Sequence, residues 1–186
     1  MLKKWKILSS KIVFKTPWFE IYKDSCKTAE NHFVPTYYTW KKRDCVIIFP
    51  VTKYHEVILI KQYRHGLKKV CIDYPGGTID RGYSIFEAAK HELREETGYE
   101  TDKFELIGNY AMDSSYSNQM THFVFAKECE QRSKPSNPRE VTEIIKIPKE
   151  TLADFVEKNV ECILCSLITY KGISYFNKLI SSQKTK

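Results

Sequence analysis

The chain has 186 residues and a formal net charge of +7 at pH 7, and 42% of its residues are hydrophobic. This length fits one domain, or one domain with an attached subdomain, and the hydrophobic content excludes a globally disordered chain. No apolar run approaches the ~20 residues of a membrane helix, and no apolar segment follows the basic N-terminus as in a secretory signal, so we expect a cytoplasmic protein without membrane spans.

Six strands are predicted in the first 75 residues. The first three are alternating or apolar runs with turns between them, at 5–14, 18–25 and 33–41. The next three have the apolar composition of buried strands, at 45–51, 56–64 and 69–75. The last of these ends at two adjacent glycines, Gly76 and Gly77, which predict a tight turn.

A helix is predicted over residues 85–97 from signals at both of its ends. Ser84 is a favourable N-cap, and Glu87 three residues later completes a Ser-x-x-Glu capping box. Gly98 is the residue type that commonly ends a helix. At about 100° per residue, four apolar side chains share one face, which we expect to be buried: Ile85, Phe86, Ala89 and Leu93.

Three carboxylates, Glu92, Glu95 and Glu96, form a strip at the edge of that apolar face. Like charges three and four residues apart cost roughly 0.2–0.5 kcal/mol per pair, and negative charge in the last turn opposes the helix dipole. A bound divalent cation would offset both costs, because hard ions such as Mg²⁺ take oxygen ligands. The alternative is a solvated acidic turn balanced by the basic side chains nearby, Lys90, His91 and Arg94.

Strands and helices alternate irregularly in the rest of the chain. Strands are predicted at 104–111, 121–128 and 141–147. A polar, proline-containing loop is predicted at 131–140. One helix is predicted to start close to Pro148, and a last one covers about 163–180 with a disturbance at Gly172. This order favours an α/β fold with a mixed sheet between helices.

Six cysteines are scattered along the chain, and only Cys162-x-x-Cys165 has suggestive spacing. The pair lies in the predicted last helix, and no second pair accompanies it, which argues against a zinc site. A redox role stays open, although we favour free buried thiols.

Residues 77–99, with the sequence GTIDRGYSIFEAAKHELREETGY, carry a recognisable motif. They resemble the Nudix box, G-x5-E-x7-R-E-U-x-E-E-x-G-U, where U is aliphatic or aromatic. The matching positions are Gly77, Glu92, Leu93, Glu95, Glu96, Gly98 and, more loosely, Tyr99. Outside the box, KQYRHG at 61–66 and IDYPGGTID at 72–80 are similar to segments of the ADP-ribose pyrophosphatase branch of that family.

Two positions depart from the box. Tyr83 stands at its first glutamate, where it can act as a hydrophobic staple onto Ala88. His91 stands at its arginine, which in the family helps to hold a catalytic carboxylate. His91 lies four residues before Glu95 and can still donate a hydrogen bond to it, so we expect slower or more pH-sensitive activity. The alternative is that His91 is only an exposed helix residue.

The resemblance implies a Nudix-type α/β/α sandwich around a mixed sheet, formed by residues 43–186. Residues 1–42 would form the small N-terminal β subdomain of the branch. That subdomain commonly helps to build a homodimer in which both chains contribute to each substrate site.

The resemblance also implies a metal site. Glu92, Glu95 and Glu96 are the expected ligands of Mg²⁺, with Mn²⁺ as an alternative, and Gly76 would add its backbone carbonyl. Metal ions neutralise the anionic oxygens around phosphorus and lower the pKa of a bound water. The alternative is that the two glycines form a tight turn and have no role in metal binding.

The remaining site residues are less defined. A glutamate from a late loop often activates water in this branch, and Glu140 and Glu143 occupy the corresponding region, although both could be solvated surface residues. Glu95 is also expected to be a catalytic carboxylate. Arg64 ends a predicted strand and is a candidate phosphate clamp, because a guanidinium matches paired phosphate oxygens.

We therefore expect a metal-dependent Nudix hydrolase of nucleoside diphosphate sugars, with ADP-ribose cleaved to AMP and ribose 5-phosphate. One alternative substrate is GDP-mannose. A rival function is a catalytically silent nucleotide sensor, suggested by Tyr83 and His91. Nucleic-acid binding is not indicated, because the basic residues are spread along the chain rather than clustered.

Overall fold

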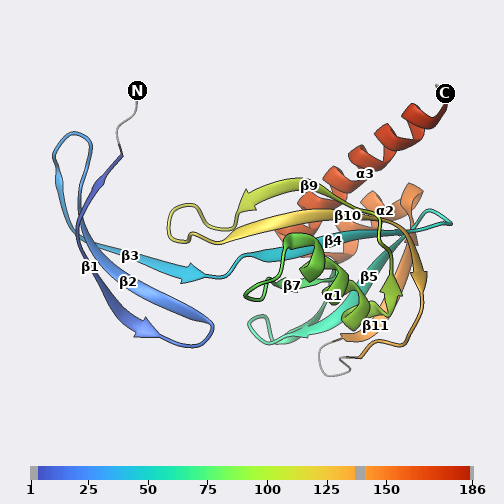
Figure 1. Cartoon of the computed structure of the whole chain (residues 1–186), viewed down its shortest axis with the longest axis horizontal. Coiled ribbons are helices and arrows are strands. Elements are labelled where there is room, and N and C mark those ends of the chain that lie inside the picture. Colours follow the sequence, from blue (N-terminus) through green and yellow to red (C-terminus); the bar gives the residue numbers. More distant parts are fainter. Residues whose placement is uncertain (1–3, 137–140, 185–186) are drawn as a thin grey trace. The chain divides into compact units, whose positions relative to one another are not determined.

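Figure 1 shows a computed structural model of the chain, which describes residues 4–136 and 141–184. The chain divides into two compact units. Residues 1–44 and 110–121 form the first, and residues 45–109 and 122–186 form the second. Within the described residues, no helix is long and apolar enough to cross a membrane.

The first unit is built on an antiparallel sheet in the order β1-β2-β3. Its strands are β1 (Lys6–Lys15), β2 (Phe19–Lys27) and β3 (Phe33–Lys42), as predicted to within two residues. Every residue of β1 is exposed. Tyr116, from the segment 110–121, stacks on Trp40 of β3 and accepts its backbone N–H at 2.8 Å. The first unit is therefore assembled from two separate stretches of the chain.

The second unit contains an eight-stranded sheet. Its path runs β11-β5-β4-β10-β8, while β6 pairs with β5, β7 with β4, and β9 with β10. The strands are β4 (Cys45–Thr52), β5 (Glu56–Arg64), β6 (Lys69–Asp73), β7 (Gly76–Thr78), β8 (Tyr99–Glu100), β9 (Phe104–Ala111), β10 (Met120–Gln131) and β11 (Val141–Pro148).

Helices pack against this sheet (Figure 1). They are α1 (Ile85–Thr97), α2 (Leu152–Asn159) and α3 (Ile163–Lys184), and a short 3₁₀ turn, η1 (Lys149–Thr151), precedes α2. Successive side chains of β4 point to opposite faces of the sheet, which explains how α1 and α3 pack against it. Val46 and Ile48 belong to the core that includes Ala89 and Leu93 of α1, whereas Phe49 faces Gly172 of α3. Helices on both faces of the sheet confirm the predicted α/β sandwich.

Some local predictions were wrong. Phe86 was expected in the core but remains 44% exposed. The helix expected to start close to Pro148 begins as the 3₁₀ turn, and the α-helix starts only at Leu152. Gly172 does not disturb α3, which is continuous from Ile163 to Lys184. Its lack of a side chain makes room for Phe49, because a Cβ at Gly172 would lie 2.3 Å from the Phe49 ring.

Candidate functional site

The two ends of α1 are fixed by the contacts that the sequence predicted. The Ser84 side chain accepts the Glu87 backbone N–H, and the Glu87 side chain accepts the Ser84 backbone N–H, which completes the capping box. At the other end Gly98 is left-handed, with φ at 71°, and donates its N–H to Arg94 O. A Cβ at Gly98 would lie 2.1 Å from Ser133 O. The last turn of α1 is therefore held tightly where its three glutamates lie.

Two of these glutamates meet the glycine strand β7. Gly76 donates its backbone N–H to Glu96 Oε2 at 2.8 Å, and Glu96 is only 4% exposed. A Cβ at Gly77 would lie 2.2 Å from Glu92 Oε1, so only glycine lets this carboxylate approach. Both glycines are paired with β4, which fixes their position. The structure thus brings Gly76, Gly77, Glu92 and Glu96 together.

The third glutamate, Glu95, is more exposed and has a different neighbour. Its Oε2 lies 3.4 Å from His91 Nδ1, one turn earlier on α1. The His91 ring in turn packs edge-on against Tyr83 with centroids 6.1 Å apart. The two residues that depart from the family motif are therefore in contact with each other, and His91 takes the place beside Glu95 that its spacing predicted.

The donor set at this end of α1 suits a hard divalent cation. Three carboxylates and neighbouring backbone carbonyls are the oxygen ligands that Mg²⁺ and Mn²⁺ prefer. A carboxylate as deeply buried as that of Glu96 is costly unless it is paired or binds a metal. The absence of side-chain bulk at Gly77 leaves Glu92 against the backbone of β7. The residues present therefore fit such an ion.

Arg64 lies at the end of β5 and is positioned by a buried carboxylate. Its Nε donates to Asp73 Oδ2 at 2.7 Å, while the Arg64 side chain remains 49% exposed. Gln62 Nε2 donates to the same oxygen at 3.1 Å. Asp73 thereby sets the direction of the guanidinium. The role of Asp73 was not predicted, although an acidic residue inside an apolar strand was the available signal.

The two proposed general bases differ in what can be described. Glu143 is an exposed residue of β11 whose Oε2 lies 2.7 Å from Lys61 Nζ on the neighbouring β5. Glu140 lies outside the described residues. Glu143 already has the ion-pair partner of an ordinary surface residue, so its role as a base stays a prediction.

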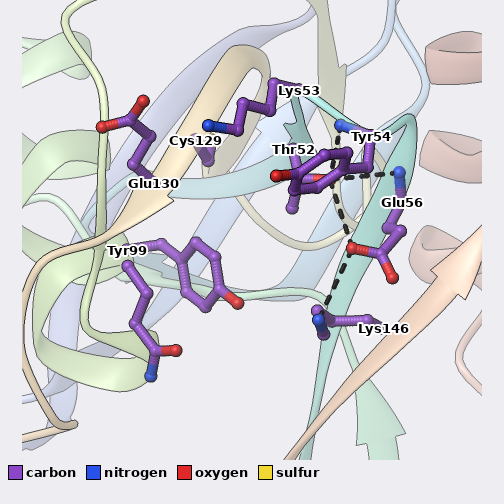
Figure 2. Close-up of a pocket in the computed structure, with 9 residues that line it drawn as sticks. Thr52, Lys53, Tyr54, Glu56, Tyr99, Cys129, Glu130 and Lys146 are labelled. Atoms are coloured by element: carbon purple, nitrogen blue, oxygen red, sulfur yellow. Dashed lines mark hydrogen bonds and ion pairs between the residues drawn. The ribbon is translucent and has the colours of Figure 1, made fainter.

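A pocket of about 360 Å³ lies elsewhere in the second unit, near the β4–β5 turn and the ends of β10 and β11 (Figure 2). Thr52 Oγ1 accepts the backbone N–H groups of Tyr54 and Glu56 there, and Glu56 pairs with Lys146 at 3.5 Å. Its other lining residues are Lys53, Tyr99, Cys129, Glu130 and Gln131. The predicted site residues are not among those that line it.

Comparison with protein families gives two matches that divide the chain near residue 40. Residues 41–162 match the NUDIX domain. Residues 5–40 match the nucleoside diphosphate sugar hydrolase N-terminal domain. The two matches meet between residues 40 and 41, near the end of β3 (Phe33–Lys42).

Several known proteins are similar to the chain. Mouse (Mus musculus) ADP-sugar pyrophosphatase is 37% identical over 60% of this chain and 56% of its own length. The ADP compounds hydrolase NudE of Escherichia coli K12 is 29% identical over 62% of this chain and 61% of its own length. The ADP-ribose pyrophosphatase of Bacillus subtilis 168 is 25% identical, over 63% and 64% respectively. The chain thus spans about half to two thirds of the length of these relatives.

The fold has a counterpart among solved structures. A crystal structure of an ADP compounds hydrolase superposes with a TM-score of 0.81, covering 98% of this chain and 97% of that one. At 22% sequence identity, this likeness establishes the fold alone.

Proposed function

Because the chain belongs to the NUDIX domain family, we propose that it hydrolyses the pyrophosphate bond of a nucleoside diphosphate linked to a sugar. ADP-ribose is the first substrate to test, with AMP and ribose 5-phosphate as products. The match of residues 5–40 to a nucleoside diphosphate sugar hydrolase domain supports this substrate class, as do the names of the mouse and E. coli relatives.

One observation carries the proposal: the buried carboxylate of Glu96 lies against the backbone of Gly76, beside Glu92. Glu92, Glu95 and Glu96 would hold a divalent cation, Mg²⁺ or Mn²⁺, with the Gly76 carbonyl as a further ligand. When bound, such an ion neutralises charge on the pyrophosphate oxygens and lowers the pKa of a water molecule.

The chain's own groups would do the remaining work. Asp73 aims the Arg64 guanidinium, whose N–H groups bind a phosphate of the substrate in the orientation required for attack. His91 orients Glu95 from one turn away on α1. The base that removes a proton from water is Glu95 or a glutamate of the region before and within β11, Glu140 or Glu143.

The test is product release from a panel of substrates. The purified chain is incubated with Mg²⁺ and ADP-ribose, ADP-glucose, GDP-mannose, NADH, diadenosine polyphosphates or dNTPs, and nucleoside monophosphate is quantified. We expect the highest rate with ADP-ribose. Glu96→Gln should abolish turnover with the fold intact, whereas Glu157→Gln on the exposed side of α2 should retain it. Full turnover by Glu96→Gln would contradict the proposed ligands.

A nucleotide sensor is the second candidate, and the contact between Tyr83 and His91 supports it, because both replace residues of the family motif. A sensor would bind ADP-ribose without releasing AMP. Calorimetric binding together with the product assay therefore separates the two functions. Faster hydrolysis of GDP-mannose than of ADP-ribose would instead revise the substrate.

We further propose that the chain forms a homodimer through its three-stranded sheet. β1 is exposed throughout, and its exposed apolar residues include Ile7, Leu8, Ile12 and Phe14. Extended apolar surface of this kind marks interaction sites, and a second copy of the chain would cover it. A cytoplasmic location stays a prediction.

A further inference from the structure

The N-terminus of α3 brings two thiols to a buried carboxylate. Atoms of Asp73, Cys162 and Cys165 that could act as ligands lie within 4.8 Å of one another. Cys162 directly precedes α3, and its carbonyl accepts the backbone N–H of Ser166 at 3.0 Å, so it occupies the N-cap position. Cys165 lies in the first turn, and its Sγ donates to Asp73 Oδ1 at 3.4 Å.

The spacing of the two cysteines allows a disulfide. Both thiols are free, and they are three residues apart at the start of a helix, so their side chains lie on the same side of it. The Cα separation of such a pair falls within the ~4.4–6.8 Å range that disulfides span. Side-chain rotation, without rebuilding of the fold, can therefore bring the two sulfur atoms together.

The two thiols have different surroundings. Cys162 is half-buried, whereas Cys165 is 3% exposed. Cys165 shares its single S–H between Asp73 and Cys162, and this contact, aided by the N–H groups of Cys165 and Leu164, lowers the pKa of Cys162 to about 6 against burial and the charge of Asp73. The neighbouring Cys162 and burial raise the pKa of Cys165. This asymmetry gives Cys162 the character of an attacking thiolate and Cys165 that of a resolving thiol.

Asp73 connects this pair to the proposed substrate site. One of its oxygens, Oδ1, accepts from Cys165, while the other, Oδ2, accepts from Arg64 and Gln62. A second contact ties the same elements together, because Lys69 of β6 pairs with Glu161, the residue before Cys162. The state of the thiols is therefore two hydrogen bonds away from Arg64.

We propose that Cys162 and Cys165 form a reversible disulfide, and that its formation changes the hold of Asp73 on Arg64. The oxidant is a low-molecular-weight disulfide such as oxidised glutathione. Disulfide formation stands independently of the activity proposed above. The effect on substrate rests on that proposed function.

The chemistry is thiol–disulfide exchange in two steps. Cys162 thiolate attacks one sulfur of the oxidant, forming a mixed disulfide and releasing one thiolate. Cys165 then loses its proton, which passes through Asp73 to solvent or to the released thiolate, and its sulfur attacks Cys162 Sγ. The second thiolate leaves as the internal disulfide forms. In total two protein thiols are oxidised, and one small disulfide is reduced to two thiols.

Oxidation removes a donor from Asp73. The S–H of Cys165 no longer exists in the disulfide, so Oδ1 of this buried carboxylate lacks the hydrogen bond that it accepts in the reduced chain. Arg64 is the neighbouring donor with N–H groups that can bind both carboxylate oxygens. Asp73 then holds the guanidinium more completely and leaves fewer N–H groups for phosphate. The oxidised chain is therefore expected to bind substrate more weakly.

A zinc site is the competing use of the same three side chains. Two thiolates and a carboxylate are zinc ligands, but a structural site has four ligands. Asp73 already accepts two donors at Oδ2. The geometry favours the disulfide, and the test decides between the two.

The first arm of the experiment follows the disulfide alone. The full chain is reduced, freed of reductant and incubated with defined ratios of reduced and oxidised glutathione, and intact mass and peptide maps are recorded. We expect the mass to fall by two hydrogens, with the link between Cys162 and Cys165. Cys165→Ser should trap one glutathione on Cys162, and Cys162→Ser should not trap one on Cys165. Glutathione attached preferentially to other cysteines would overturn the proposal, as would stoichiometric zinc that Cys162→Ser loses.

The second arm measures the link to Arg64. KM for ADP-ribose should rise about three- to tenfold on oxidation, the scale of one typical intramolecular hydrogen bond, and should return after reduction, with kcat unchanged. Cys162→Ser under the same oxidant is the control and should keep the KM of the reduced chain. An unchanged KM in a chain shown by mass to be oxidised would overturn the coupling.

A third readout needs no substrate, so a failure of the proposed function does not hide the result. The ¹⁵N NMR signal of Arg64 Nε–H, assigned with Arg64→Lys, should shift between the reduced and oxidised chains. A chain that forms the disulfide and shifts this signal without hydrolysing ADP-ribose would refute the activity alone. A signal that stays in place would refute the coupling.

Discussion

The backbone N–H of Gly76 donates to Glu96 Oε2 across 2.8 Å, joining the glycine strand to a carboxylate 20 residues later. One turn earlier on α1, Glu92 lies so close to Gly77 that a Cβ there would be 2.2 Å from its Oε1. The acidic turn of α1 and strand β7 therefore form one structural unit. Substitutions on the strand should act on the carboxylates.

Gly77→Ala tests this relationship directly. The new methyl group would displace the Glu92 carboxylate, so we expect kcat/KM with Mg²⁺ to fall about ten- to a hundredfold while the chain stays folded. Gly66→Ala is the matched control, because a Cβ at Gly66 meets no atom within 4 Å. Steady-state kinetics over a Mg²⁺ titration, with circular dichroism for the fold, give the answer. Equal activity of the two variants would contradict the role of Glu92.

Arg64→Lys should separate binding from chemistry. Lysine keeps the charge but loses the planar set of donors that Asp73 orients. We expect KM for ADP-ribose to rise about tenfold, which corresponds to about 1.4 kcal/mol, with a smaller change in kcat. Lys68→Arg, in the loop between β5 and β6, is the control. A change confined to kcat would show that Arg64 acts in the chemical step instead.

His91→Arg restores the residue that the family motif carries at this position. The guanidinium would offer Glu95 more donors than the imidazole, which lies 3.4 Å away. We expect kcat to rise about three- to tenfold, the scale of one typical intramolecular hydrogen bond. Lys90→Arg, on the exposed side of α1, should leave kcat unchanged. A loss of activity in His91→Arg would mean that the contact between His91 and Tyr83 is itself required.

The exposed strand β1 gives a prediction about assembly. Leu8→Lys with Ile12→Lys places two charges on its exposed apolar surface, so the proposed dimer should dissociate to a monomer. Sedimentation velocity measures the mass directly. Lys11→Glu, on the same strand, is the comparison for a change of charge without loss of apolar surface. A parent chain that sediments as a monomer would remove the proposal.

Alkylation of Cys162 should report its low pKa. Hydrogen bonds from Cys165 and from backbone N–H groups lower that pKa from 9.0 to about 6, against the opposing charge of Asp73. Because the thiolate is the nucleophile, the rate with iodoacetamide should rise as pH increases through about 6 and level off near pH 7. A cysteine in a short peptide should still be gaining rate above pH 8. Cys165→Ser should move the Cys162 profile towards that of the peptide.

The local signals of the sequence predicted α1 well. Ser84, Glu87 and Gly98 act within one turn of the helix, so their roles can be inferred without knowing the fold. The strands of the first unit follow the same logic, since alternation along one segment is enough to identify them. The closeness of Glu92 and Glu96 to the glycines followed from a known motif rather than from local physics.

Other features depend on residues far apart in the chain. The role of Asp73 depends on its hydrogen bonds with Arg64 on the neighbouring strand and with Cys165, 92 residues later. Gly172 was expected to disturb a helix, but its role is to accommodate Phe49. Phe86 satisfied the apolar periodicity of α1 and is nevertheless exposed. Periodicity indicates which side of a helix is buried. Which residues on that side are buried depends on how far the strands and loops packed against the helix extend.

The first unit draws on two stretches of sequence, because Tyr116 stacks on Trp40 from a segment that begins at residue 110. An expression fragment that stops at residue 44 would therefore leave the indole of Trp40 without its aromatic neighbour. A chimaera that took only its N-terminal segment from a relative would place the relative's strand β3 beside this chain's segment 110–121. A functional recombinant of such proteins should therefore take both stretches from the same parent, and the two stretches are expected to evolve together.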